Sequence, residues 1–381
     1  MIIVGKGDDP YRMAREVLRE FPLPSLKRRK VLIKPNAGRV ALPGDGVTTH
    51  PKVVEAVIDE FLKRGVERIA IGESCIFGVD SEEAFRATGM KEVSERKGVP
   101  LIDLDRERPI EIRIPDGRVL NKIKVSSIVK DFDFIVSVPV MKTHMHTRVS
   151  LSLKNMKGLL WQKEKARLHQ LPYEKGNPQG DKALDIAISD MALALFPNLA
   201  IIDGLVGMEG MGPAYGVKKN AGLIVIGDNP LSTDAVASRL MGFRTGEIPH
   251  LTLTQEKGLG EIEVSKILIT PKDYLKWETP FKPPPSQISF GFPDVVIYDE
   301  GACSACLSTL FVLLHHYYDE LFRYRLEDGK IHIGLGKHFN HLPNGTILIG
   351  NCTSKMKKSG ILIQGCPPVP SQIIRSLKRK A

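Results

Sequence analysis

Four cysteines in the C-terminal quarter of this 381-residue chain constrain its fold more than any other feature. They are Cys303, Cys306, Cys352 and Cys366. Each follows a short apolar run bounded by glycine or proline, and such runs are typical of strands. The runs span residues 294–298, 346–350 and 361–364. Because parallel strands end at the same edge of a sheet, the sequence predicts four thiols that converge at one edge of a small α/β domain.

Four converging thiolates hold either a [4Fe–4S] cluster or a structural zinc ion. Zinc ribbons usually carry two Cys-x-x-Cys motifs, whereas this chain has one, formed by Cys303 and Cys306. Pro367 after Cys366 is similar to the Cys-Pro of bacterial ferredoxins, although their compact run of four cysteines is absent. We therefore expect a [4Fe–4S] cluster. Zinc, or cysteines with structural roles only, are the alternatives.

The order of these motifs resembles the cluster-binding subunits of respiratory complex I and of nickel–iron hydrogenases. The likeness covers a Cys-x-x-Cys pair, a later cysteine at a strand end, and Gly-Cys-Pro-Pro at 365–368 with a helix behind it. It implies an iron–sulfur cluster. The fifth cysteine, Cys75, stands alone, and we expect it to be a loop or packing thiol.

Charge and hydropathy narrow the class of protein. The chain has no run of eighteen apolar residues and no N-terminal signal pattern, so we expect a cytoplasmic protein without a membrane span. A net charge of +10 is typical of a solvated surface with surplus lysine. The alternatives are a small anionic substrate or an acidic redox partner, which a positive field would attract. Aromatic residues make up only 6%, which disfavours nucleic acid. The surplus of Lys, Arg and Glu is typical of a heat-adapted source, and a homo-oligomer is left open.

Residues 1–285 alternate apolar runs with amphipathic segments, which predicts a large domain with a doubly wound, mainly parallel sheet. Expected strands include residues 31–33, 68–72, 132–139, 199–203 and 222–226, and expected helices include 10–21, 50–62, 181–196 and 231–241. A hairpin is expected at 110–124. Three prolines at 283–285 favour a stiff link, so residues 286–381 form the small α/β domain with the four cysteines.

Several strands of the large domain end in polar loops, where doubly wound sheets bind ligands. Histidine titrates near neutrality, and a lysine beside it can orient an anion or stabilise an enolate. These loops therefore predict an electropositive pocket for a carboxylate or phosphate. The candidate catalytic residues are Lys142, His144, Lys154, His50 and Glu209, and the candidate binding residues are Lys34, Asn36, His146, Asn155, Asp203 and Asp228.

A metal site is the alternative interpretation of the same loops. His144 and His146 are two positions apart, so in a strand they point to one face, where Glu209 or Asp203 could complete the ligands. The glycines at 207–212 do not follow the Rossmann order, and the chain has no Walker phosphate loop and no Gly-x-Ser-x-Gly. These absences disfavour nucleoside triphosphatases and common hydrolases.

Separated motifs across residues 30–243 carry a family resemblance. They are Lys34-Pro-Asn36, Thr49-His50-Pro51, Lys142-Thr-His144, Lys154-Asn155-x-x-Gly158, Asp203-Gly204, Glu209-Gly210, Asp228-x-Pro230 and Asp234-Ala235. Together they resemble the uncharacterised "domain of unknown function 362". Members often carry a ferredoxin-type segment beside this domain, so the resemblance implies an iron–sulfur association and no established reaction. This chain departs from that pattern because its cysteines are dispersed.

Three functions follow from these observations. The first is an iron–sulfur oxidoreductase or electron-transfer protein with a basic pocket for a small anion. The second is a non-redox isomerase or lyase that acts on an organic acid, in which Lys142 and His144 move protons and the cysteine site is structural. The third is a binding module in which the four cysteines hold zinc.

Overall fold

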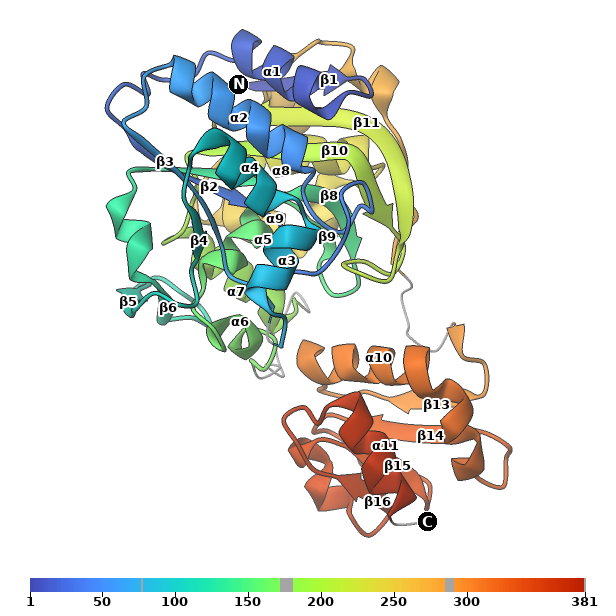
Figure 1. Cartoon of the computed structure of the whole chain (residues 1–381). Helices are drawn as coiled ribbons and strands as arrows, with labels where there is room; N and C mark the ends of the chain where they lie inside the picture. The colour runs from blue at the N-terminus through green and yellow to red at the C-terminus, as the bar shows by residue number, and fades with distance from the viewer. Residues whose placement is uncertain (77, 172–180, 285–290, 380–381) are drawn as a thin grey trace. The chain divides into compact units, whose positions relative to one another are not determined.

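The computed structural model describes residues 1–76, 78–171, 181–284 and 291–379 (Figure 1). The chain divides into two compact units. The large unit contains Met1–Lys165 and Asp185–Pro284, and the small unit contains Ala166–Leu184 and Pro285–Ala381. The sequence predicts a single boundary after residue 285, and it assigns residues 166–184 to the large domain. That segment instead groups with the small unit, to which His169 and Gln170 are hydrogen-bonded. These bonds use a backbone carbonyl and a side-chain amide, so no hydrophobic pattern in the sequence could indicate them.

The large unit is built on one sheet, in which the described residues form ten strands. They are β1 (Ile2–Lys6), β2 (Lys30–Pro35), β3 (Arg68–Glu73), β4 (Leu101–Asp103), β7 (Phe134–Val138), β8 (Val140–His144), β9 (Arg148–Ser150), β10 (Leu199–Glu209), β11 (Val217–Gly227) and β12 (Ile269–Thr270). The order is β12-β1-β11-β10-β7-β2-β3-β4, and β8 pairs with β10 and β9. The run from β10 to β4 is parallel. The expected mainly parallel sheet is therefore confirmed.

Helices cover both faces of this sheet (Figure 1). They are α1 (Pro10–Glu20), α2 (Pro51–Lys63), α3 (Ser81–Ala87), α4 (Met90–Lys97), α5 (Ser152–Asn155), α7 (Ala183–Ala192), α8 (Pro230–Leu240) and α9 (Pro249–Glu256). The short helix α6 (Glu164–Arg167) spans the boundary between the two units. Alternate strand residues such as Ile33 and Ile201 pack with α1, α2 and α4 in one core. Their neighbours Leu32 and Ile202 are fully buried outside that core, as a sheet covered on both faces requires.

Two of the expected loops prove to be strands. Lys142 and His144 lie in β8, and residues 203–209 continue β10, where the sequence predicts a loop. The glycines obscure the strand pattern, and they are needed because β8 runs close to them. A methyl group on Gly207 would lie 2.5 Å from the Met141 carbonyl oxygen. The expected hairpin is confirmed as β5 (Pro109–Arg113) and β6 (Lys122–Ser126).

The small unit is a four-stranded parallel sheet among the described residues, in the order β13-β14-β15-β16. Its elements are β13 (Val295–Tyr298), α10 (Ser304–Leu321), β14 (Ile331–Leu335), β15 (Thr346–Ile349), the 3-10 helix η8 (Asn351–Met356), β16 (Gly360–Ile363) and α11 (Pro370–Lys378). Alternate residues of the strands, such as Ile333 and Ile347, form a core with Leu310 and Leu314 of α10 and Ile373 of α11. This core holds the ends of the strands in fixed register.

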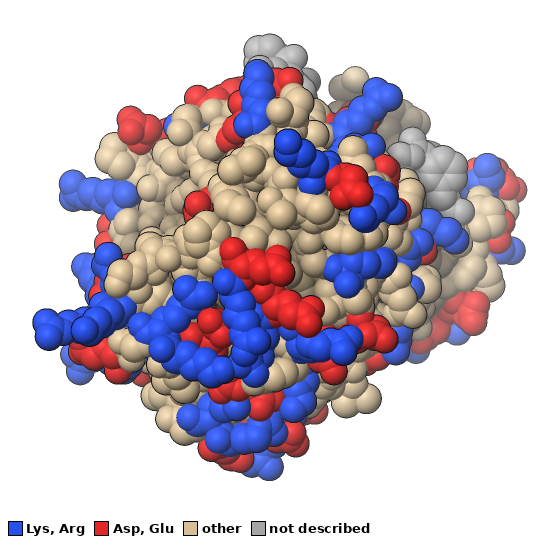
Figure 2. Space-filling model, turned by 90° about the horizontal axis from the view of Figure 1, so that it is seen from above, with Lys and Arg blue, Asp and Glu red and all other residues tan. Residues whose placement is uncertain are grey.

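The surplus of positive charge does not gather into one patch on the face that Figure 2 shows. Lysine and arginine side chains are intermixed there with aspartate and glutamate (Figure 2). Ion pairs link α2 and α4 in the same intermixed way, for example between Lys97 and Asp59 at 2.8 Å. In the described residues, no helix is long and apolar enough to cross a membrane.

Candidate functional site

A buried ion pair joins the ends of two neighbouring strands of the large unit. The Lys34 Nζ atom at the end of β2 lies 2.8 Å from a carboxylate oxygen of Glu73 at the end of β3, and both side chains are at most 2% exposed. Glu73 also accepts hydrogen bonds from the backbone N–H of Ala37 at 2.8 Å and of Ser74 at 2.9 Å. Lys34 was predicted to bind ligand, but its ammonium group is already neutralised inside the fold.

The Lys-Asn-x-x-Gly motif at 154–158 closes over this pair. The Asn155 amide donates to the Lys34 carbonyl oxygen at 2.9 Å, and its Oδ1 accepts from Lys34 Nζ at 3.3 Å. A methyl group on Gly158 would lie 2.3 Å from Glu73 Oε1 and 2.5 Å from Lys34 Nζ. Asn155 and Gly158 therefore shape the floor of the site, and Glu73, which the sequence did not single out, lies at its centre.

Lys142 lies on β8, and its ammonium group faces the loop that follows β2. Its Nζ donates to Asn36 Oδ1 at 2.6 Å and to the Val47 carbonyl oxygen at 2.7 Å. Asn36 is held by Thr49, whose hydroxyl accepts from the Asn36 backbone N–H at 2.8 Å. The structure thus brings together Lys142 and Asn36, as the sequence predicts.

Positive charge accumulates around Lys142. Burial, reinforced by the charges of Arg39 and Lys154, lowers the pKa of Lys142 well below its usual range. Burial and the charge of Arg39 lower the pKa of Lys154 to about 7. Burial, together with Lys154, also lowers the pKa of Lys157 well below its usual range. Arg39 lies in the loop after β2, and no motif in the sequence identified it.

His50 and Asp203 hold the start of α2. His50 is the N-cap of this helix, and its Nδ1 accepts from the Lys52 backbone N–H at 3.2 Å. The backbone N–H of His50 donates to the Asp203 carboxylate at 2.7 Å. Burial lowers the pKa of His50, and burial raises the pKa of Asp203 to about 6. The helix expected at 50–62 is therefore confirmed, with His50 as its N-cap and Pro51 in its first turn.

The two histidines of β8 and its following turn are both buried. The rings of His144 and His146 have centroids 5.7 Å apart, and His144 Nδ1 accepts from the His146 backbone N–H at 3.1 Å. Glu209 accepts from the Lys282 backbone N–H at 3.0 Å and pairs with Lys219 at 3.3 Å. Asp203, the other carboxylate predicted for this metal site, accepts from the His50 backbone N–H at 2.7 Å. Asp228 pairs with the N-terminal amino group at 2.9 Å. Among the described residues, no group of three His, Cys, Asp or Glu side chains that could hold a metal ion includes the two histidines.

Asp234 is a further buried carboxylate that the site depends on. It lies on α8 and accepts from the backbone N–H groups of Ser152 at 2.8 Å and Leu153 at 2.9 Å, which start α5. Burial raises its pKa to about 8. Asp234 therefore positions α5, the helix that carries Lys154 and Asn155, and its place in the family motif has this structural reason.

The four cysteines lie at the strand ends of the small unit. Cys303 is the N-cap of α10 and Cys306 lies in its first turn, after β13. Cys352 follows β15 in η8, and Cys366 follows β16. The loops of the last two are joined by hydrogen bonds of 2.9 Å between Asn351 and Gly365. Gly350, with φ +97°, brings the β15 loop close to Cys306, since an added methyl would lie 3.4 Å from its sulfur.

The electrostatics of the thiols reflect this proximity. A hydrogen bond with Cys306, helped by the backbone N–H groups of Cys306 and Ala305, lowers the pKa of Cys303 to about 6. The same bond and burial raise the pKa of Cys306, on which the charges of Cys352 and Cys366 also act. Burial raises the pKa of Cys366. In the parts of the chain that are described, no three His, Cys, Asp or Glu side chains are close enough together to hold one metal ion.

The segment after α6 adds two residues to the surroundings of these cysteines. The His169 carbonyl oxygen accepts from the Ala305 N–H at 3.1 Å, and its Nδ1 lies 2.9 Å from Ser304 Oγ. Gln170 donates to the Cys366 carbonyl oxygen at 2.7 Å. No pattern in the sequence indicates a role for either residue. The remaining cysteine, Cys75, is buried in the large unit, and burial raises its pKa to about 12.

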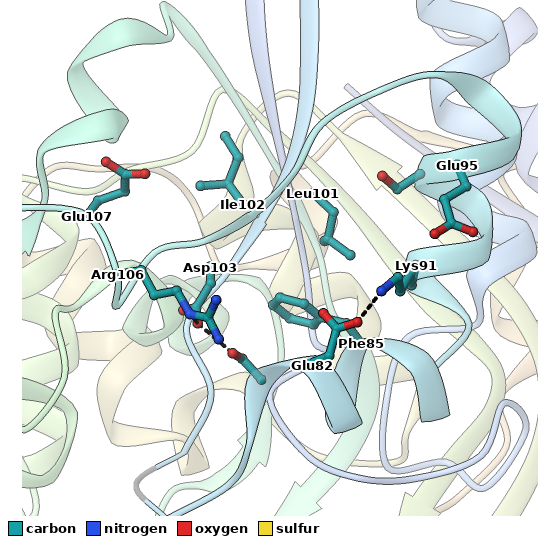
Figure 3. A pocket seen from close by; sticks show the side chains of 11 residues that line it. Glu82, Phe85, Lys91, Glu95, Leu101, Ile102, Asp103, Arg106 and Glu107 are labelled. Carbon is teal, nitrogen blue, oxygen red and sulfur yellow. Dashed lines mark hydrogen bonds and ion pairs between the residues drawn. The ribbon is translucent and has the colours of Figure 1, made fainter.

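A cavity of about 430 Å³ lies between α3, α4 and the edge strand β4 (Figure 3). Of the charged residues that line it, Lys91 pairs with Glu82 and Arg106 pairs with Asp103 (Figure 3). None of the site residues predicted from the sequence lines it.

Comparison with known proteins places these observations in a family. The family model described as "Domain of unknown function (DUF362)" matches residues 31–239. A thylakoid-associated protein of Synechocystis sp. is 26% identical over 271 residues, which are 70% of this chain and 80% of that protein. Two solved structures match with low scores. The lactate racemase apoprotein of Thermoanaerobacterium thermosaccharolyticum gives a TM-score of 0.40 at 12% identity, covering 63% of this chain and 57% of its own. A Thermotoga maritima protein gives 0.36 at 16%, covering 66% and 60%, so this chain spans less than two thirds of either.

Proposed function

The chain belongs to the family described as "Domain of unknown function (DUF362)", and we propose that this member is an iron–sulfur redox protein. Cys303, Cys306, Cys352 and Cys366 would hold a [4Fe–4S] cluster. When bound, such a cluster supplies one-electron transfer. The observation that carries the proposal is the geometry of the cysteine loops at the strand ends of one parallel sheet. The loops of Cys352 and Cys366 are joined by hydrogen bonds between Asn351 and Gly365, and Gly350 lies beside the sulfur of Cys306 in the first turn of α10.

The chemistry of the donor set fits a cluster better than a single metal ion, because each of the four thiolates of a [4Fe–4S] cluster binds a different iron atom. All four candidate ligands are thiols, and the backbone N–H of Cys306 stabilises a thiolate at Cys303. Hydrogen bonds to the sulfurs are among the features that set the potential of iron–sulfur clusters. Lys337 adds a positive charge that acts on Cys366. These residues would hold the cluster and compensate its negative charge.

The large unit would bind the small anionic substrate or the anionic part of a redox partner. Lys142 and Asn36 bond to each other at 2.6 Å, and the charges of Arg39 and Lys154 act on Lys142, which supports an anion-binding role for this part of the large unit. The buried Lys34–Glu73 pair and the Asp234 contact to α5 hold this place in position. His50 has a structural role at the start of α2 in this proposal.

A second function is favoured by one observation. Lys154 has a pKa of about 7, and a lysine that titrates near neutrality can act as a general base. An isomerase or lyase that acts on an organic acid would use this group, with the cysteine site as a structural support. Activity that requires no electron donor or acceptor would favour this function over the redox one.

The test is metal analysis with a visible spectrum of the full chain purified without oxygen. We expect about four irons and four sulfides per chain and a broad brown absorbance that bleaches with dithionite. Cys306→Ser should lose most of the iron. Cys75→Ser is the matched control, because Cys75 is a buried thiol of the large unit, and it should keep the iron and the colour. A colourless protein with one zinc per chain would overturn the redox proposal and favour the zinc module.

A further inference from the structure

The last part of the chain contains no aspartate or glutamate after Asp328. Residues 329–381 carry nine positive charges, whereas the net charge of the whole chain is +10. These nine are Lys330, Lys337, Lys355, Lys357, Lys358, Arg375, Lys378, Arg379 and Lys380. The preceding residues of the small unit, from β13 to the end of α10, contain acidic side chains such as Asp299 and Glu320. The positive surplus of the protein is therefore concentrated in one stretch of the small unit.

The topology of the small sheet turns this separation along the chain into a separation in space. The strands lie side by side in chain order, β13-β14-β15-β16 (Figure 1). The acid-free stretch therefore forms one side of the unit, from β14 through η8 and β16 to α11, whose Ile373 shares a core with Ile363 of β16. Where the two sides meet, Lys378 of α11 pairs with Glu320 of α10. We call residues 329–379 the basic half.

Most cations of the basic half point into solvent. Lys355 of η8 and the two lysines that follow it, Lys357 and Lys358, are exposed, and within the described part of the chain none of the three has an ion pair. Arg375 and Arg379 are also exposed, four positions apart at the end of α11, while the residues between them include the buried Leu377. Exposed charges of one sign create a field that attracts an oppositely charged partner and raises its association rate.

Two of the four cysteines lie in the same half. Cys352 is in η8, three positions before Lys355, and Cys366 follows β16. Both are exposed, whereas Cys306 in α10 is buried. Their loops are joined by the hydrogen bonds between Asn351 and Gly365 at 2.9 Å. The exposed part of the proposed cluster site thus belongs to the basic half, and a redox partner that approaches it meets a surface without carboxylates of that half.

We propose that the basic half is the docking surface for an electron-transfer protein with an acidic face. One electron leaves the reduced partner and reduces the cluster, and no bond forms or breaks. Nucleic acid is disfavoured as the occupant, because Phe339 is the only aromatic residue in residues 329–381 and bases would find no stacking platform. This inference rests on the proposed redox function and names the partner of its cluster, which leaves the polar strand ends of the large unit to the small anion.

The experiment is isothermal titration calorimetry of the full chain, purified without oxygen, with an acidic plant-type [2Fe–2S] ferredoxin as the probe. We expect binding at about 0.1 M ionic strength that is lost at about 1 M, where the Debye length falls to about 3 Å. The triple variant Lys355→Glu, Lys357→Glu and Lys358→Glu should bind at least about tenfold more weakly, because it reverses charge within the contact.

A second triple variant is the matched control. Lys27→Glu, Lys63→Glu and Lys130→Glu change the net charge by the same amount at exposed lysines of the large unit. At about 0.1 M ionic strength, charges more than about 10 Å from the contact are largely screened. The control should therefore bind the ferredoxin nearly as well as the wild type does.

The outcomes separate this inference from the redox proposal, because iron content is measured in parallel. No ferredoxin binding by an iron-containing wild type, equal losses in the two triple variants, or tighter binding of a DNA duplex than of the ferredoxin would each overturn the docking surface alone. Weaker binding by the first triple variant with retained iron supports it. Should that variant fold poorly or lose iron, Arg375→Glu with Arg379→Glu gives the same test on α11. Wild type that lacks iron yet binds the ferredoxin overturns the redox proposal and leaves an acidic protein as the partner.

Discussion

Replacing Glu73 with glutamine should lower the unfolding free energy of the large unit by about 3–5 kcal/mol, the cost of breaking a buried ion pair. The substitution keeps the volume but leaves the Lys34 ammonium, which is 1% exposed, without its counter-charge. Glu73 also accepts from two backbone N–H groups at 2.8 Å and 2.9 Å. One amide end of glutamine would face these donors with a donor of its own. Because domains are stable by only about 5–15 kcal/mol, this loss is a large share of the total.

Urea unfolding followed by tryptophan fluorescence measures this effect in the large unit alone, because both tryptophans, Trp161 and Trp277, belong to it. Glu111→Gln is the matched control. Glu111 pairs with Lys122 at 3.0 Å across the β5–β6 hairpin, but both side chains are more than 40% exposed. Removing this exposed pair should cost at most about 1 kcal/mol.

A loss for Glu73→Gln no larger than that for Glu111→Gln would refute the structural role of the Lys34–Glu73 pair. Lys34 would then be a candidate ligand-binding residue again, as the sequence predicts. The double variant Lys34→Met with Glu73→Leu gives a second check. Replacing both charges with apolar groups of similar volume should recover much of the stability lost in the single variant. Such a replacement of a buried ion pair often leaves the free energy of unfolding unchanged or raises it.

Gly158→Ala should lower the unfolding free energy by about 1–3 kcal/mol, because the added methyl would clash with Glu73 and Lys34. Gly246→Ala is the control. No atom lies within 4 Å of its added methyl, so the urea midpoint should change little. Asp234→Asn should flatten the pH dependence of stability. Burial raises the pKa of Asp234 from near 3.8 to about 8, so the native state binds the extra proton between these values and stability falls as pH rises through that window. An unchanged slope in urea midpoints from pH 4 to 8 would contradict this. Sulfate affinity should fall as pH rises above about 7, by up to about tenfold per unit from Lys154, whose pKa is about 7 before the anion binds. In Lys154→Arg, the dependence of the logarithm of sulfate affinity on pH, measured by calorimetry, should lose the contribution of one proton. An identical dependence in the variant would exclude Lys154 from the anion site.

The sequence predicts the parts of the fold that repeat a local pattern. Apolar runs such as Val31–Ile33 indicate buried parallel strands, and the parallel sheet of the small unit follows from the runs before the cysteines. Strand ends at one edge also predict that Lys142 and Asn36 approach each other, as they do at 2.6 Å. These predictions succeed because a parallel sheet turns sequence-distant strand ends into neighbours.

The remaining features depend on partners that no local pattern shows. Glu73 looks like the polar end of a strand, and its ion pair becomes visible only when β2 lies beside β3. Residues 203–209 look like a glycine-rich loop, although their glycines serve the close approach of β8. Arg39 lies outside every motif. Its charge acts on Lys142 and Lys154, which lie more than a hundred residues away in the sequence.

The contacts of His169 and Gln170 bear on how the small unit can be moved between proteins. The carbonyl of His169 caps the first turn of α10, and Gln170 holds the backbone of Cys366. Transplanting residues 291–379 alone into another protein would therefore remove the cap of α10 and the hydrogen bond that holds the Cys366 loop. A graft that also carries residues 166–171 would keep both contacts. The segment to transplant is therefore made of two pieces that are separate in the sequence.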